Sequence, residues 1–487
     1  MVVLSSPYKA PGAIRFGTDG WRGIIGADFT FDRLYQAALA AAVTLAEVYG
    51  GDRSSQTVIV GYDRRFLSEE FAQTAALAVQ STGLTALLSD RYAPTPAFSW
   101  AAYDRQALGA LVITASHNPG SYSGLKVKGA FGGSVPPEVT QQIEQRLAAG
   151  MQGSSPPATP PHCETFDPWE SYCQVLRSKV NIEKIRTALQ TGQLLAYVDA
   201  MHGAAAGGLG QILDYAIPEL RSDRDPLFGG SAPEPLARHL EKLMSILASP
   251  RDPATLGVGF VFDGDADRIA AIGSQGQFLS SQILIPILIE HLASRHNLPG
   301  ELVKTVSGSD LMPMVAKRYG LSVSETAVGY KYIADRMLQV PVLLGGEESG
   351  GIGYGNHIPE RDGLLSALYL LEAMVDSGEN LDQIYDRLCQ ETGFASAYDR
   401  IDLPLASQAV QQKVRDNLEQ TPPTTIADQA VVDCITTDGY KFRLEDDRWL
   451  MIRFSGTEPL LRLYCEGPSV EAVQATLTWA KDWAESL

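Results

Sequence analysis

Apolar runs alternate with helix-like stretches along most of this 487-residue sequence. TVIVGYD (57–63) predicts a buried strand, and SEEFAQTAALAVQSTG (68–83) predicts a helix that ends at Gly83. The order of strand, turn and helix returns near residues 194 and 301. Strands that alternate with helices indicate α/β units with largely parallel sheets, so this pattern limits the fold class more than any other feature.

The length of the chain predicts several domains. A chain of 487 residues is too long for one hydrophobic core, and domain sizes predict three or four domains. GMQGSSPPATPP (150–161) has the composition of a linker, and the pattern after residue 393 changes to short strands and a final helix. We expect three related α/β domains with mixed sheets and a smaller α+β C-terminal domain, at residues 1–165, 166–273, 274–392 and 393–487.

Composition excludes several classes of function. The net charge of −18 argues against a nucleic-acid partner but leaves small anionic substrates open, because a local basic pocket can override the global field. Five cysteines without CxxC spacing suit a reducing compartment, and no signal peptide is apparent. ILIPILIEHLA, near residue 283, is shorter than the ~20 residues of a membrane span and predicts a core helix. We therefore expect a cytoplasmic protein without a membrane partner.

The segment TASHNP (114–119) places Ser116 directly after an apolar strand. Turn chemistry alone accounts for such a sequence, because Ser, Asn and Pro all favour turns. A serine hydrolase is a weak alternative: adjacent Ser and His side chains rarely form a nucleophile and base, and a GxSxG elbow does not accompany them. By itself this segment leaves a turn and an exposed nucleophile as open alternatives.

The segment DGDADR places Asp263, Asp265 and Asp267 on a tight loop after a strand. Three carboxylates so close together repel one another unless a cation neutralises them, and hard oxygen ligands favour Mg²⁺ or Ca²⁺. A solvated acidic turn is the alternative, although Gly264 and Ala266 give such a loop little to pack with. An EF-hand is disfavoured, because the bidentate Glu at loop position 12 is absent.

The segment RFSGTEP (453–459), with Arg462 shortly after it, has the composition of a phosphate site. Hydroxyl groups, backbone N–H groups and guanidinium ions bind a phosphate dianion, and Arg does so through two parallel hydrogen bonds. A Ser-Gly turn between two strands is the alternative.

Two further loops complete the set of candidates. GEESGG (346–351) offers Glu347 and Ser349 to sugar hydroxyls, although a flexible acidic turn explains it equally well. FGTDGWRG (16–23) holds Arg22 in a glycine-rich loop, where an arginine suits a phosphoryl group, although a lone arginine is more often a surface residue. A candidate nucleophile, a divalent-cation site, a phosphate site and a hydroxyl-binding loop together indicate phosphoryl transfer.

These five motifs, in this order, resemble those of the α-D-phosphohexomutases, the phosphoglucomutase/phosphomannomutase superfamily, over residues 16 to 466. The resemblance implies four domains around a central cleft. It also implies that Ser116 is carried as a phosphoserine whose phosphate completes the shell of one Mg²⁺ per chain, with Asp263, Asp265 and Asp267 as the other ligands.

The same resemblance implies roles for the remaining candidates. Arg22 would stabilise the transferring phosphoryl group, and His117 and Lys126 would serve proton transfer or charge stabilisation near the serine. The residues that would bind substrate are Arg268, Gly329, Tyr330, Lys331, Glu347, Ser349, Arg453, Ser455, Gly456, Thr457 and Arg462.

The activity implied is a two-step exchange between glucose 1-phosphate and glucose 6-phosphate. Glucose 1,6-bisphosphate would be the intermediate and also the activator or priming donor. Tyr330-Lys331 and GEESGG resemble the phosphoglucomutase branch, which favours glucose phosphates among the hexose phosphates. The alternatives are a hexose-1,6-bisphosphate synthase, a phosphomannomutase and a noncatalytic sugar-phosphate-binding protein. The chain is expected to be a monomer or dimer.

Some residues depart from the family pattern or remain outside it. Ser123 stands where many relatives have Asn, and Ala266 stands where many have Gly. His357 is close enough to GEESGG to be a candidate substrate contact. The settings of four further histidines suggest structural or surface roles: His202, His239, His291 and His296.

Overall fold

The computed structural model describes residues 12–17, 19–51, 55–150, 162–454 and 460–487. Most of the predicted linker at 150–161 and the predicted substrate residues Ser455, Gly456 and Thr457 therefore lie outside the described residues. The described part forms four sheets of six, five, four and six strands, and domains 1 to 4 are named here by these sheets in chain order. The predicted boundaries between the domains stay predictions.

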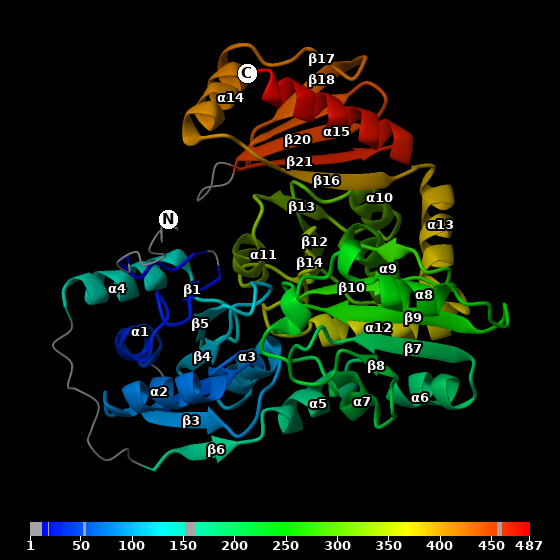
Figure 1. Ribbon diagram of the computed structural model, residues 1–487. Coiled ribbons are helices and arrows are strands. Elements are labelled where there is room, and N and C mark those ends of the chain that lie inside the picture. Colours follow the sequence, from blue (N-terminus) through cyan, green and yellow to red (C-terminus); the bar gives the residue numbers. More distant parts are fainter. Residues whose placement is uncertain (1–11, 18, 52–54, 151–161, 455–459) are drawn as a thin grey trace, which may run out of the picture.

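Domain 1 is a mixed sheet with helices on both faces (Figure 1). Its elements are β1 (Trp21–Ile24), α1 (Phe31–Tyr49), β2 (Thr57–Tyr62), α2 (Ser68–Gln80), β3 (Thr85–Ser89), α3 (Thr95–Asp104), β4 (Gly109–Ile113), β5 (Tyr122–Gly129), α4 (Pro137–Ala148) and β6 (Glu164–Phe166). The strand order is β1-β5-β4-β2-β3-β6. Side chains alternate along β2, so Val58 and Val60 pack with α1, α2 and α4, whereas Ile59 packs with α3.

The helix predicted to end at Gly83 ends three residues earlier, at Gln80. The backbone N–H of Gly83 bonds to the carbonyl of Gln80, which is a turn rather than a helical contact. Gly83 has a φ of 86°, a left-handed conformation that suits glycine and turns the chain toward β3.

Domains 2 and 3 repeat the α/β arrangement. Domain 2 contains α5 (Trp169–Arg177), α6 (Ile182–Gln190), β7 (Leu194–Asp199), α7 (Gly208–Leu213), β8 (Glu219–Leu220), the 3₁₀ turns Phe228–Gly230 and Ala237–His239, α8 (Glu241–Ala248), β9 (Leu256–Phe262), β10 (Ile269–Ile272) and β11 (Phe278–Leu279). Domain 3 contains α9 (Ser281–Ser294), β12 (Glu301–Thr305), α10 (Leu311–Arg318), β13 (Val323–Thr326), α11 (Tyr330–Met337), β14 (Val342–Gly346), β15 (Ile352–Tyr354), α12 (Gly363–Ser377) and α13 (Leu381–Thr392). One continuous hydrophobic core joins domains 1, 2 and 3. The predicted core helix near residue 283 is α9, and most of its side chains are buried.

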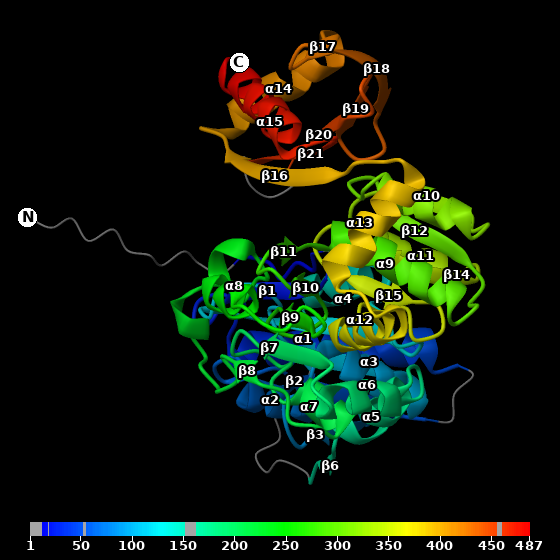
Figure 2. The same ribbon diagram turned by 90° about the vertical axis from the view of Figure 1, so that its right-hand side faces the viewer.

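Domain 4 has a core of its own. It contains β16 (Ala397–Pro404), α14 (Gln408–Gln420), β17 (Thr425–Ile426), β18 (Gln429–Ile435), β19 (Tyr440–Leu444), β20 (Trp449–Phe454), β21 (Leu460–Gly467) and α15 (Val470–Glu485). Its strands are antiparallel, and α14 and α15 supply Val414, Leu418 and Leu477 to its core. Figures 1 and 2 show this domain at one end of the molecule in both views.

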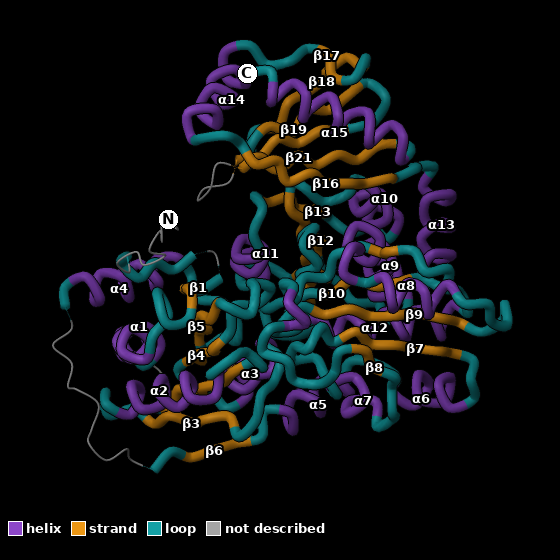
Figure 3. The backbone as a smooth tube through the Cα atoms, viewed as in Figure 1, coloured by secondary structure: helices purple, strands orange, loops and turns teal. Residues whose placement is uncertain are grey.

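The predicted fold class is confirmed: three α/β domains with mixed sheets precede a C-terminal domain of strands and helices (Figure 3). Among the described residues, no helix combines the length and the apolar character needed to cross a membrane.

Candidate active site

Three candidate loops begin where a strand of each α/β sheet ends. Ser116 follows β4, Asp263 follows β9 and Glu347 follows β14, so each lies at the carboxyl end of its strand. Ligands of open α/β sheets bind in the crevice outside the carboxyl ends of the strands. The three sheets thus bring their strand ends to one place.

Ser116 is buried and directly contacts the acidic loop. Its Oγ donates a 2.9 Å hydrogen bond to Oδ2 of Asp263 and lies 3.3 Å from Nδ1 of His117. Its φ is 52°, a conformation that costs free energy in any residue other than glycine. The Oγ1 of Thr114 accepts the backbone N–H of Ser116 at 3.0 Å, which helps to hold this conformation.

A fully buried arginine, Arg65, fixes the loop that carries Ser116. Its guanidinium donates to four backbone carbonyls, at 2.5 to 3.1 Å, of Ser116, Asn118, Pro119 and Tyr122. The carboxylate of Asp63 balances its charge at 3.2 Å. We did not predict this role; the signal in the sequence is GYDRR, which places charged residues directly after the apolar run of β2.

The three predicted metal ligands lie together and are buried. One ligand atom each from Asp263, Asp265 and Asp267 lies within 4.8 Å of the others. A Cβ atom at Gly264 would lie 2.4 Å from the carbonyl oxygen of Ser116, so only glycine allows the two loops to approach so closely. Ala266 has a φ of 56°, which explains why glycine suits this position.

Lys126 lies among these carboxylates. Its Nζ is 2.8 Å from Oδ2 of Asp265, 2.8 Å from Oδ2 of Asp267 and 2.7 Å from Oδ2 of Asp19. Burial alone would lower the pKa of Lys126, but Asp19, Asp265 and Asp267 raise it above its usual value. Lys126 is therefore a fixed positive charge.

Asp19 and Arg361 belong to the same cluster, although we did not predict either of them. Nη2 of Arg361 contacts Oδ2 of Asp19 at 2.5 Å and Oδ2 of Asp267 at 2.7 Å. Asp19 lies in FGTDGWRG, three residues before Arg22, so the motif itself was the available signal. Arg361 lies outside the five motifs, and no signal in the sequence connects it with Asp19.

The acidic loop fits a divalent cation. Within the described part of the chain, Oδ1 of Asp265 and Oδ1 of Asp267 are buried oxygen atoms that lack a hydrogen-bond partner. Burial raises the pKa of Asp263 well above its usual value, and the carboxylates of Asp265 and Asp267 add to this shift. Unpaired carboxylate oxygens at this spacing are ligands for a hard cation such as Mg²⁺.

His117 follows Ser116 in the same loop, and Arg22 contacts that loop from β1. Burial lowers the pKa of His117 well below its usual value, and the charges of Arg268 and Arg22 lower it further. The imidazole is therefore neutral at neutral pH. Nη1 of Arg22, in β1, donates to Oδ1 of Asn118 at 2.9 Å, so the structure brings Arg22 to the same loop.

The predicted sugar loop adjoins the acidic loop. The backbone N–H of Ile269 bonds to the carbonyl of Gly350 at 3.0 Å, and the backbone N–H of Arg268 bonds to Oδ1 of Asp263 at 3.2 Å. Oγ of Ser349 donates to Oε1 of Glu347 at 2.7 Å. Arg268, Glu347 and Ser349 are thus in one place with the metal candidates.

The segment at Gly329–Lys331 is positioned differently. Gly329 has a φ of 132° and precedes α11, the helix that Tyr330 begins. The ring of Tyr330 packs in an apolar cluster beneath Arg361, and its hydroxyl points to the sulfur of Met337 at 3.7 Å. Nζ of Lys331 lies over the ring of Tyr332. His357, the other candidate substrate contact, is buried and stacks on Trp100.

Arg453 and Arg462 lie directly opposite each other on β20 and β21 of domain 4. Like charges at such positions destabilise a sheet unless an anion neutralises them. Nε of Arg453 donates to Asp438 at 2.9 Å, whereas the buried Nε of Arg462 lacks a hydrogen-bond partner among the described residues. Burial would lower the pKa of Arg453, but Asp438 and, more weakly, Glu348 of the sugar loop raise it.

Family comparisons agree with this architecture. Four phosphoglucomutase/phosphomannomutase models match the chain: alpha/beta/alpha domain I at residues 13–154, domain II at 170–276, domain III at 280–392 and the C-terminal domain at 400–478. The fold and the loops at its strand ends define an enzyme of the phosphohexomutase superfamily.

Individual relatives match nearly the whole chain. A phosphoglucomutase/phosphomannomutase of Thermococcus kodakarensis is 28% identical over 95% of this chain and 96% of its own. A phosphoglucosamine mutase of Carboxydothermus hydrogenoformans is 29% identical over 94% and 96%. A crystal structure from Thermus thermophilus, provisionally named phosphomannomutase, is 32% identical, has a TM-score of 0.84 and covers 98% of this chain and 100% of its own. The chain belongs to the phosphoglucomutase/phosphomannomutase family.

More distant structures share the fold alone. The Aspergillus fumigatus N-acetylphosphoglucosamine mutase has been solved with GlcNAc-6P and magnesium, and a variant of it with glucose 1,6-bisphosphate. The first structure is 15% identical to this chain, has a TM-score of 0.57 and covers 98% of this chain and 97% of its own. The second is 14% identical, has a TM-score of 0.56 and covers 98% and 96%.

Proposed function

We propose that this enzyme interconverts glucose 1-phosphate and glucose 6-phosphate through a phosphoserine at Ser116 and a glucose 1,6-bisphosphate intermediate. The contact between Oγ of Ser116 and Oδ2 of Asp263, 2.9 Å, carries the proposal, because it joins the candidate nucleophile to the candidate cation-binding loop. The complexes of the distant Aspergillus fumigatus enzyme with magnesium and with glucose 1,6-bisphosphate support the choice of ligands.

In the first step, a hydroxyl of the sugar attacks the phosphorus of phosphorylated Ser116. The bond between phosphorus and Oγ breaks, a bond to the sugar oxygen forms, and the hydroxyl proton passes to a base. Nδ1 of His117, 3.3 Å from Oγ, is positioned to exchange a proton with the attacking or leaving oxygen. The bisphosphate then turns round, and its other phosphoryl group returns to Ser116.

Charge stabilisation is the main need of this chemistry, because negative charge spreads over the transferring oxygens. Mg²⁺ held by Asp263, Asp265, Asp267 and the Ser116 phosphate would supply positive charge at this point. Lys126 balances the carboxylates from the protein side, and Arg22 lies beside the serine loop. Glu347, Ser349 and Arg268 are positioned for sugar hydroxyls.

Arg453 and Arg462 would hold the phosphate that does not react, together with Ser455, Gly456 and Thr457. A site that recognises phosphate alone accepts either end of the bisphosphate, which the two-step exchange requires. The segment Gly329–Lys331 is expected to bind substrate through its backbone at the start of α11 and through the side chain of Lys331. The ring of Tyr330 packs in the interior and is not expected to take part.

The test follows the conversion of glucose 1-phosphate with Mg²⁺, with and without glucose 1,6-bisphosphate. We expect glucose 6-phosphate to form, a phosphate to appear in the intact mass, and Ser116→Ala to lose both. Ser121→Ala, an exposed serine of the same loop, is the matched control and should keep both. Accumulation of the bisphosphate in place of glucose 6-phosphate would instead indicate a bisphosphate synthase.

One observation favours a different sugar. The relative from Carboxydothermus hydrogenoformans is named a phosphoglucosamine mutase, at an identity as high as that of the Thermococcus kodakarensis relative. Rates with glucose, mannose and glucosamine 1-phosphates should therefore be compared. A kcat/KM for glucosamine or mannose phosphate above that for glucose phosphate would contradict the glucose assignment and leave the phosphohexomutase assignment intact.

A further inference from the structure

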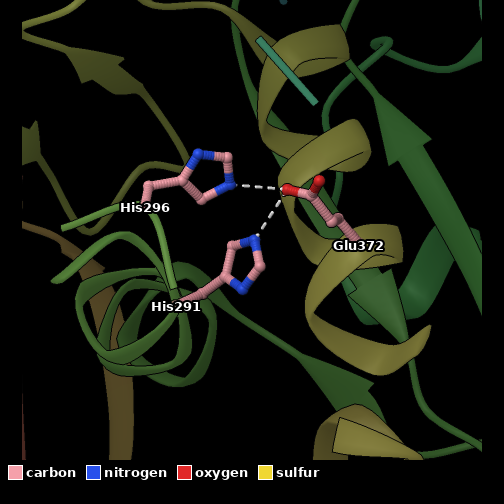
Figure 4. A group of neighbouring side chains, drawn as sticks. All are labelled: His291, His296 and Glu372. Atoms are coloured by element: carbon pink, nitrogen blue, oxygen red, sulfur yellow. Dashed lines mark hydrogen bonds and ion pairs between the residues drawn. The ribbon is translucent and has the colours of Figure 1, made fainter. Parts of the chain in front are cut away.

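His291, His296 and Glu372 meet outside the loops described above (Figure 4). His291 lies in the last turn of α9, His296 lies in the loop that follows, and Glu372 projects from α12. Both imidazoles approach one carboxylate oxygen: Nε2 of His291 is 2.9 Å and Nε2 of His296 is 2.7 Å from Oε2 of Glu372. The proposed function gives these three residues no role.

The trio is held in place by its surroundings. The other carboxylate oxygen, Oε1 of Glu372, accepts the backbone N–H of Asn181 at 2.6 Å. The ring of Tyr369, one turn earlier on α12, packs edge-on against His291 and His296 at centroid distances of 6.3 and 5.5 Å. A carboxylate fixed by a hydrogen bond behind it and two imidazoles fixed by an aromatic ring have the support that a ligand set needs.

Ligand type, spacing and access then decide what the trio binds. Two imidazole nitrogens and one carboxylate oxygen form a donor set for a borderline cation of the Zn²⁺ class, whereas Mg²⁺ prefers oxygen ligands. Four residues separate His291 from His296, within the usual range for paired histidines on zinc. The ligand atoms of a tetrahedral Zn²⁺ lie about 3.4 Å apart, so each ring needs to move by roughly half an ångström.

We propose that His291, His296 and Glu372 form a second cation site of this enzyme, which binds Zn²⁺ or a cation of the same class through two imidazoles and one carboxylate. Each imidazole binds through Nε2 and carries its proton on Nδ1. The side chain of His296 is 23% exposed, which provides an entry path and a place for a water as the fourth ligand.

The bound cation would connect domains 2 and 3. Glu372 and both histidines belong to domain 3, while Asn181 caps the first turn of α6 in domain 2. A cation on Oε2 therefore stabilises the same carboxylate that accepts the Asn181 N–H. The site is structural or regulatory rather than catalytic, because none of its residues contacts the loop of Ser116 among the described residues.

The experiment measures Zn²⁺ binding to the full chain by titration calorimetry, after dialysis against a chelator and with excess Mg²⁺ present to saturate the aspartate loop. We expect one equivalent of Zn²⁺ to bind to the wild type and to Asp265→Asn. His296→Gln and Glu372→Gln should bind at least about tenfold more weakly. His239→Gln, a histidine of domain 2, is the matched control and should bind as the wild type does.

Two results would overturn the site. One is a wild type that binds no Zn²⁺ in the presence of Mg²⁺, which leaves the trio as a hydrogen-bonded contact only. The other is His296→Gln that binds as tightly as the wild type. His296 is partly exposed, so its variant should fold, and unchanged conversion of sugar phosphate by that variant would confirm this. That activity assay also separates failure of the cation site from failure of the proposed function.

Discussion

The proposed reacting end of the site and its proposed phosphate-anchoring end rest on different cores. The strands that lead to Ser116 and Asp263 contribute Val112 and Phe262 to a core shared by domains 1 to 3. Arg453 and Arg462 lie on a domain whose core is separate. A small cluster of Val306 with Trp449, Met451 and Tyr464 joins the two parts, together with hydrogen bonds from Oγ of Ser309 and the backbone N–H of Asp310 to the buried Glu466.

This difference suits the proposed exchange. The proposed nucleophile, the acidic loop and the proposed sugar loop must keep a fixed spacing for the reaction, and a common core holds them in place. The proposed anchor needs to hold only a phosphate group, from either end of the intermediate. Changes at the reacting end should therefore lower kcat, and changes at the anchor should raise KM.

The largest effect is expected from Arg65→Met. This substitution leaves Asp63 as an unpaired buried charge and four carbonyls without their donor, at a cost of about 3–5 kcal/mol of stability. Because the carbonyl of Ser116 is among them, kcat should also fall. Thermal unfolding and turnover measure the two effects. Arg91→Met, an exposed arginine of domain 1, should change neither, and a stable, fully active Arg65→Met would contradict a shared, rigid reacting end.

Asp265→Asn is expected to act on kcat with little effect on KM. It removes negative charge from the cation site and should lower kcat by about 10²–10³-fold, while chelation of Mg²⁺ from the wild type lowers it similarly. Steady-state kinetics at saturating substrate measures this. Asp386→Asn, on an exposed face of α13, is the control. A rise in KM with an unchanged kcat would assign Asp265 to substrate binding instead.

Arg462→Ala tests the anchoring end. A hydrogen bond to a charged group contributes about 1.5–3 kcal/mol, so KM should rise about 10–100-fold while kcat changes little. The effect should be the same for glucose 1-phosphate and glucose 6-phosphate, because either phosphate binds there. Lys413→Ala, an exposed cation of α14, should leave KM unchanged. A fall in kcat alone would mean that Arg462 acts on the reacting phosphoryl group.

The sequence predicted the elements and the motifs better than the contacts between them. The strands before Ser116 and Asp263 follow from apolar runs, which local pattern alone determines. The contact of Asp19 with Arg361, 342 residues apart, follows only from how three sheets pack, and no local pattern encodes it. Tyr330 illustrates the same limit: the resemblance of Tyr330-Lys331 to the family pattern implied a substrate contact, but packing directs the ring of Tyr330 inward.

Near neutral pH, the smallest effect is expected at the interface that joins the two parts. Nζ of Lys441, in domain 4, donates to the carbonyl of Val306 at 2.8 Å. Burial lowers the pKa of Lys441 from its usual 10.5 to about 8, and the positive charge of Lys304 contributes to this shift. Between these values the unfolded chain binds more protons than the folded one, so Lys441 makes stability rise with pH by about 1.4 kcal/mol per unit. Below about pH 8 the folded and unfolded forms are both charged and this rise is absent.

Lys441→Met should therefore remove that rise. Unfolding by denaturant from about pH 7 to pH 10 measures it, as the difference between wild type and variant at each pH. Lys413→Met, exposed on the same domain, should give a curve parallel to the wild type. If the Lys441→Met curve is also parallel to that of the wild type, Lys441 is charged over the whole pH range. The interface between domain 4 and the rest of the molecule is then as hydrated as an ordinary protein surface. If the variant instead lacks the rise in stability with pH, the interface of domain 4 excludes water around Lys441. Any movement of domain 4 must then break a contact from which water is excluded.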